Sequence, residues 1–138
     1  MHNLKIIYLG ALPYAFLIAN SIFNWVDVNH LEDITFFYTH AIINFVCGYH
    51  WTLTFTAITN QARVASVIIS LISVIFGLIF LQGRIFIAGL GLVFLAITQL
   101  ILDFKSDIAG SIPMSYKIAR LFASLLMIGA TTMVLILR

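Results

Sequence analysis

The residues best suited to chemistry lie in one apolar stretch, Phe36–Gln61, which is long enough to cross a bilayer. Where a plain spanning segment would carry leucine, this stretch has His40, Asn44, Cys47, His50 and Trp51. Polar and ionisable groups at membrane depth are costly, so they usually face the protein interior and often mark function. We therefore predict that this segment turns its polar side chains toward other helices.

Helical spacing places most of these side chains on one face. At about 100° per residue, His40, Asn44, Cys47 and Thr54 fall within one arc of a helix. We call these four residues the polar stripe. A structural alternative is that the stripe only hydrogen-bonds to a neighbouring helix and that Cys47 is a small packing residue.

The histidine spacing argues against a metal or haem centre. His40 and His50 are separated by about 15 Å along a helix, which is too far for both to bind one metal ion. A haem with two histidine ligands needs a second histidine at similar depth, and both His2 and His30 lie outside the apolar segments. We expect no metal and no cofactor, with haem or quinone as the alternatives.

The composition is that of an integral membrane protein. Of 138 residues only 9% are charged, and the mean hydropathy is +1.11. So few charges cannot cover the surface of a soluble protein of this size. The net charge of +2 is too small and too dispersed for nucleic-acid binding, so the lipid bilayer is the expected surrounding.

Five apolar segments are long enough to span a bilayer, and the breaks between them are short. They cover about 4–25, 34–59, 64–81, 85–102 and 117–137. Short connections make consecutive helices antiparallel neighbours. The sequence therefore predicts a single all-α domain over residues 1–138, a bundle of five transmembrane helices with short loops.

The placement of Lys and Arg predicts the orientation of this bundle. One side collects Lys5, Arg63, Lys105, Lys117 and Arg120, and the other has only Arg84 and Arg138. Because positive residues concentrate on the inner side, we expect the N-terminus inside and the C-terminus outside.

Several segments of the chain resemble a known family. Ala41–Leu53, which reads A-I-I-N-F-V-C-G-Y-H-W-T-L, is similar to the signature of an uncharacterised family of five-helix membrane proteins that includes mitochondrial transmembrane protein 69. The segments Leu9–Pro13, Leu100–Asp103 and Pro113–Arg120 agree as well, although Cys47 and Thr52 stand where the family has glycine. The resemblance implies five helices and a bacterial or mitochondrial inner membrane, and it implies no activity.

The predicted orientation brings a second group of residues to the inner side. This inner zone consists of Gly48, His50, Trp51, Asp103, Lys117 and Arg120. Asp103 and Arg120 are expected to form an ion pair at the membrane boundary. We interpret the zone as a ligand or partner site, against the alternative of ordinary interface anchoring by basic and aromatic residues.

Three functions compete on this evidence. The first is a non-enzymatic accessory or assembly subunit of a larger membrane complex, such as a respiratory one, because no catalytic motif or phosphate-binding loop is found and small residues recur on helix faces. Other transmembrane subunits are then the expected partners. The second is a small oligomeric permease or channel lined by the polar stripe. The third is a component that binds quinone or lipid through His50 and Trp51.

Overall fold

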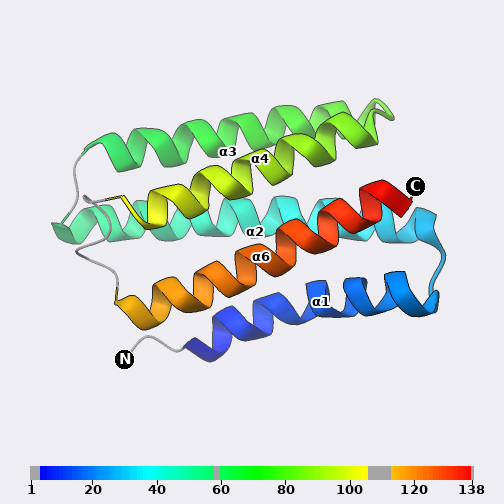
Figure 1. The fold of residues 1–138 in the computed structure, drawn as a ribbon. Helices are drawn as coiled ribbons and strands as arrows, with labels where there is room; N and C mark the ends of the chain where they lie inside the picture. Colours follow the sequence, from blue (N-terminus) through cyan, green and yellow to red (C-terminus); the bar gives the residue numbers. More distant parts are fainter. Residues whose placement is uncertain (1–3, 58–59, 106–112, 138) are drawn as a thin grey trace.

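The computed structural model describes residues 4–57, 60–105 and 113–137, and side chains for 5, 7–27, 30–49, 64–105 and 113–137. Within them the chain forms five α-helices: α1 (Leu4–Phe23), α2 (Val28–Ala57), α3 (Asn60–Leu81), α4 (Ile85–Asp103) and α6 (Met114–Leu137). The helices run side by side, and α1 begins at the opposite end of the bundle from the end of α6 (Figure 1). The prediction of an all-α bundle of five helices is confirmed.

The second helix is longer than its apolar segment. It begins at Val28 rather than near Ile34, so most of the polar residues expected in the first loop form its opening turns. Asn20 closes the short turn before it, since its side chain accepts from the Val26 N–H at 2.8 Å and donates to the Val26 carbonyl at 3.3 Å. The break between helices is therefore set by this local hydrogen bonding and not by the polarity of the residues.

A tight turn joins α3 to α4. Gly83 adopts a positive φ of 79°, its N–H donates to the Phe80 carbonyl at 2.9 Å, and the Arg84 N–H donates to the Ile79 carbonyl at 3.3 Å. These two bonds form a Schellman motif, in which a left-handed glycine satisfies the last carbonyls of a helix. The turn makes α3 and α4 an antiparallel hairpin (Figure 1).

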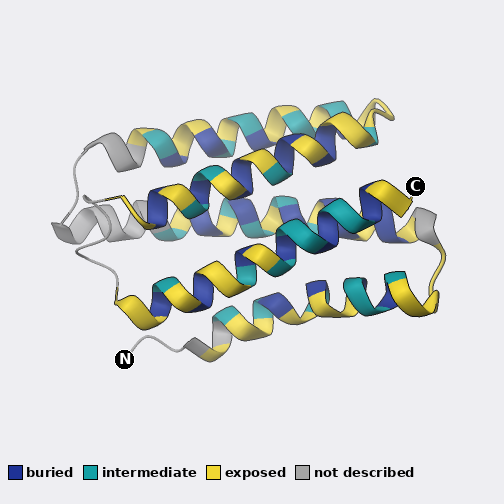
Figure 2. Cartoon of the chain, viewed as in Figure 1, coloured by how far each residue is buried: buried dark blue, intermediate teal, exposed yellow. Residues whose placement is uncertain are grey.

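The helices expose apolar residues outward, as expected for a protein surrounded by lipid (Figure 2). Three helical segments are long and apolar enough to cross a membrane: Val64–Leu81, Ile85–Asp103 and Met114–Leu137. The apolar part of α1, Ile7–Phe23, is shorter. Polar residues lower the hydropathy of α2, so its place in the bilayer depends on finding partners for those residues within the bundle.

Helix packing leaves one side of the bundle loosely closed. α2, α3 and α4 pack around a core in which the rings of Phe36 and Phe80 stack with centroids 3.9 Å apart. α1 packs chiefly against α6 and has few contacts with α2. The space between α1, α2 and α6 is where the cavity described below lies.

Candidate ligand-binding site

The first half of the polar stripe is used to join α2 to α3. The Asn44 side chain donates from Nδ2 to Ser73 Oγ at 3.0 Å, and Ser70 Oγ donates to Asn44 Oδ1 at 2.6 Å. His40 Nε2 lies 3.1 Å from the Ser73 carbonyl oxygen. Because a carbonyl can only accept, Nε2 is the protonated nitrogen in this arrangement. These hydrogen bonds occupy His40 and Asn44 within the protein.

Cys47 serves a second interhelical contact. Gln99 of α4 donates from Nε2 to the Ile43 carbonyl at 2.7 Å and to Cys47 Sγ at 3.1 Å. Both Gln99 and Cys47 are buried, and Cys47 belongs to the apolar core between α2, α3 and α4. Cys47 is therefore a packing residue, as the structural alternative for the stripe predicts. The side chain of Thr54 lies outside the described residues.

A third polar contact joins α1, α2 and α6. Tyr14 donates to Thr39 Oγ1 at 3.1 Å, and Thr39 Oγ1 lies 3.3 Å from Thr131 Oγ1. One turn away, the Tyr38 hydroxyl donates to the Gly10 carbonyl at 2.7 Å. These hydrogen bonds attach α1 to the bundle near the middle of the helix.

The predicted ion pair between α4 and α6 is formed. Arg120 Nε lies 3.1 Å from Asp103 Oδ2, and the side chains are only 7% and 0% exposed. The pair is thus buried between α4 and α6. The rings of Tyr49 and Tyr116 stack beside it with centroids 5.1 Å apart, within electrostatic range of both charges. Two charges and two phenols therefore form one cluster, here called the Arg120 cluster.

A cavity of about 400 Å³ opens next to this cluster, between α1, α2 and α6. Its walls are formed by Ile7, Gly10, Ala11, Tyr14, Ile42, Phe45, Val46, Tyr49, Tyr116, Arg120, Ala123, Ser124 and Met127. Most of this surface is apolar. The polar groups from α6 follow one face of that helix, because Tyr116, Arg120 and Ser124 are spaced four residues apart.

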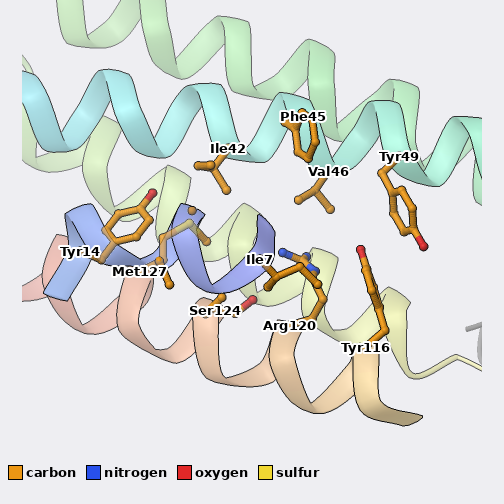
Figure 3. A pocket seen from close by; sticks show the side chains of 13 residues that line it. Ile7, Tyr14, Ile42, Phe45, Val46, Tyr49, Tyr116, Arg120, Ser124 and Met127 are labelled. Atoms are coloured by element: carbon orange, nitrogen blue, oxygen red, sulfur yellow. The ribbon is translucent and has the colours of Figure 1, made fainter. Parts of the chain in front are cut away.

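Side chains in the cavity take clear directions (Figure 3). Tyr49 and Tyr116 extend toward each other from α2 and α6, and the guanidinium end of Arg120 points toward Ile7 and Val46. Ser124 is buried, and its Oγ has no hydrogen-bond partner among the described residues. The cavity therefore offers hydrogen-bond donors at one end and an apolar wall along the rest.

The inner zone predicted from sequence is only partly assembled around this cavity. Asp103 and Arg120 come together, whereas Lys117 is half-buried but does not line the cavity. Gly48 is exposed and also lies outside the cavity wall, with no neighbour within 4 Å of the position where a Cβ would stand. His50 and Trp51 lie on α2, with side chains outside the described residues.

Sequence reasoning missed the residues that complete the cluster. Tyrosine is common at membrane interfaces, so the sequence does not single out Tyr49 and Tyr116. Only the packing of α2 on α6 shows that their rings meet. Ser124 had a detectable signal, since it stands one helical turn after Arg120 on the same face. Gln99 had one as well, because it is an amide in the middle of an apolar segment.

Neither metal-ligand geometry nor similarity to known proteins identifies the site. Among the described residues, no group of three or more His, Cys, Asp or Glu side chains is close enough to hold a metal ion. A scan against protein-family models finds no match, and searches of curated proteins and of solved structures find none either. The function is therefore inferred from the cavity and the residues around it.

Proposed function

We propose that this protein is a small, non-enzymatic integral membrane protein that binds a lipid-soluble amphiphile between α1, α2 and α6. The observation that carries the proposal is the cavity itself, with its apolar walls and the polar Arg120 cluster at one end. A volume of about 400 Å³ lies within the range usual for small-molecule sites, which are mostly apolar with a few oriented polar groups. Quinone and membrane lipid have this division between an apolar chain and a polar head.

The cavity is accessible from the lipid side. Phe45 forms part of its wall and is 68% exposed, so the cavity reaches the outer surface of α2. α1, which closes the other side, has few contacts with α2. A ligand dissolved in the bilayer can therefore enter sideways, without passing through water.

The hydrogen bonding of the polar stripe favours this role over a channel. A conducting path along the stripe needs side chains free to exchange hydrogen bonds with water or ions. His40 and Asn44 instead bond to Ser70 and Ser73 of α3. Their part in this proposal is to hold α2 against α3, so that α2 forms a fixed wall for the cavity.

We further propose that the binding protein acts as an accessory subunit of a larger inner-membrane complex. The turns at residues 24–27 and 82–84 are short, which leaves little described structure outside the helices and makes lateral contact within the membrane the natural mode of association. Purification from native membranes in a mild detergent is expected to recover other transmembrane chains in fixed ratio. Recovery of the protein alone would contradict the subunit role and leave the ligand site unaffected.

Photolabelling in a bilayer tests the ligand site. A phospholipid with a photoreactive diazirine in its acyl chain should label Ile42 or Met127 in the cavity more strongly than Leu71, which is exposed on α3. Gly10→Leu is expected to remove the excess labelling, because Gly10 lines the cavity and a Cβ added there meets no atom within 4 Å, which leaves room for the leucine to occupy the space.

Gly129→Leu is the matched control. A Cβ added at Gly129 also meets no atom within 4 Å, but Gly129 does not line the cavity. The control should retain the labelling pattern of the unmodified protein. Equal labelling of cavity and lipid-facing residues, or equal loss in both variants, would overturn the proposed ligand site.

A further inference from the structure

The charge balance of the Arg120 cluster indicates which head group the cavity accepts. Among the described residues, Arg120 is the only charged one in the cavity wall, and its partner Asp103 is fully buried. The pair is neutral as a unit. An anionic head group that approached Arg120 would also approach the Asp103 carboxylate, in surroundings where charges are weakly screened. The cavity is therefore unfavourable for a second negative charge.

Two groups in the cavity wall, the Arg120 guanidinium and the Ser124 hydroxyl, can donate to a ligand oxygen. Arg120 uses Nε for Asp103, and the remaining end of its guanidinium, which can only donate, points into the cavity (Figure 3). Ser124 is 2% exposed as a residue, and its hydroxyl has no hydrogen-bond partner among the described residues. A buried hydroxyl without a partner is unfavourable, so a ligand oxygen placed there stabilises the complex.

Both donors lie on one wall of the cavity, where one ligand can reach them together. Arg120 and Ser124 are one helical turn apart on the same face of α6, and both line the cavity. A ring with carbonyl oxygens on opposite sides can meet both donors at once. The aromatic rings of Tyr49 and Tyr116 border the same end of the cavity, and the apolar wall continues along Ile42 and Met127.

We infer that the ligand is a neutral lipophile whose head group bears two acceptor oxygens, the chemistry of a benzoquinone with an alkyl chain. The inference rests on the proposed ligand site and specifies its chemical class. It assigns Arg120 and Ser124 as the residues that hold the two oxygens. In this assignment Asp103 cancels the charge of Arg120. Its carboxylate also disfavours the anionic head group of a fatty acid.

Competition against the photoreactive phospholipid tests this inference. A decyl-substituted benzoquinone should reduce labelling of Ile42 and Met127 at a concentration about tenfold lower than decanoate, which has a comparable chain and an anionic head. Decane, which has no oxygen, should compete no better than decanoate.

Ser124→Ala tests the assignment of the second oxygen. It should weaken competition by the quinone about fivefold, the value of one hydrogen bond, and leave competition by decanoate unchanged. Ser115→Ala is the control, because Ser115 is exposed at the start of α6 and does not line the cavity.

The outcomes separate the two proposals. If the cavity is labelled but decanoate competes as well as the quinone, or if Ser124→Ala leaves the quinone unaffected, the inference about the head group is wrong while the ligand site stands. If the cavity residues are not labelled in excess, the ligand site itself fails.

Discussion

Asp103 and Arg120 illustrate how a charged residue can be accommodated away from water. Each would be strongly unfavourable alone in the interior, and pairing at 3.1 Å makes burial of both tolerable. Asn44 and Gln99 follow the same rule with hydrogen bonds, since each bonds to an adjacent helix. At the scale of the residue, these side chains join the helices because each of them bonds to a partner on an adjacent helix.

The burial of this ion pair predicts an asymmetry between single and double substitutions. Arg120→Met should lower the free energy of unfolding by about 3 kcal/mol, because it leaves the Asp103 carboxylate buried without its cation. Arg120→Met combined with Asp103→Leu should recover most of that loss, since no charge then remains between α4 and α6. Unfolding in detergent, followed by circular dichroism during titration with sodium dodecyl sulfate, measures both.

Additive losses in the double variant would contradict this account of the pair. A suitable reference is Thr98→Val, since the Thr98 hydroxyl makes an exposed hydrogen bond, among the described residues, to the Phe94 carbonyl one turn back on the same helix. That change should have little effect on stability.

At the scale of the element, glycines decide how closely α4 approaches its neighbours. A Cβ at Gly91 would collide with the ring of Phe76 on α3, and a Cβ at Gly89 would lie 2.7 Å from the end of the Leu135 side chain on α6. A leucine end can rotate away, whereas a packed aromatic ring has less freedom. Gly91 is therefore a position where the α3–α4 hairpin is sensitive to the size of the side chain.

Gly91→Ala should destabilise the protein by about 1–3 kcal/mol, the usual cost of forcing extra volume into a packed interface. Phe76→Leu in the same chain should restore part of the loss by making room for the new methyl group. Thermal unfolding in detergent micelles provides the measurement.

Gly129→Ala serves as the reference for this prediction, because a Cβ there meets nothing within 4 Å. It should be neutral or slightly stabilising, since alanine favours a helix more than glycine does. Equal destabilisation at Gly91 and Gly129 would mean that contact with Phe76 is not the cause of the effect.

At the scale of the whole molecule, the hydropathy of a helix does not show how many other helices it contacts. The most apolar helices, α3 and α4, expose many large apolar side chains to their surroundings. α2 is less apolar and contacts α3, α4 and α6. A helix surrounded by others can hold polar residues because its partners are protein groups and not lipid.

A bundle whose helices cross the bilayer predicts that the two ends of α4 lie on opposite sides of the membrane. In a Cys47→Ala background, Arg84→Cys and Lys105→Cys place single thiols at exposed positions that flank the two ends of α4. If the basic side is inner, an impermeant maleimide should label Arg84→Cys in right-side-out vesicles and Lys105→Cys only after the vesicles are opened. Cys47 is a free, buried cysteine. Its replacement ensures that all labelling comes from the introduced thiol.

Labelling of both positions from outside would mean that α4 does not cross the bilayer. Labelling of Lys105→Cys alone would reverse the predicted orientation and leave the fold unchanged.

Composition and the spacing of apolar segments were sufficient to predict five helices, an all-α bundle and the pairing of Asp103 with Arg120. The helices depend on local hydrophobicity. The ion pair was predictable because the chain has few charged residues, so Asp103 and Arg120 have few alternative partners. The helix ends were less predictable, because the turn at Asn20 and Val26 is closed by side-chain bonding that polarity does not reveal.

The candidate site depended on the tertiary structure. Tyr49, Tyr116 and Ser124 come from α2 and α6, and only the packing of those helices places them around one cavity with Arg120. Sequence periodicity shows which face of a helix is polar, but it does not show which helix that face meets. The loose contact of α1 with α2 is a property of the assembled bundle, and it is the reason that a cavity exists beside them.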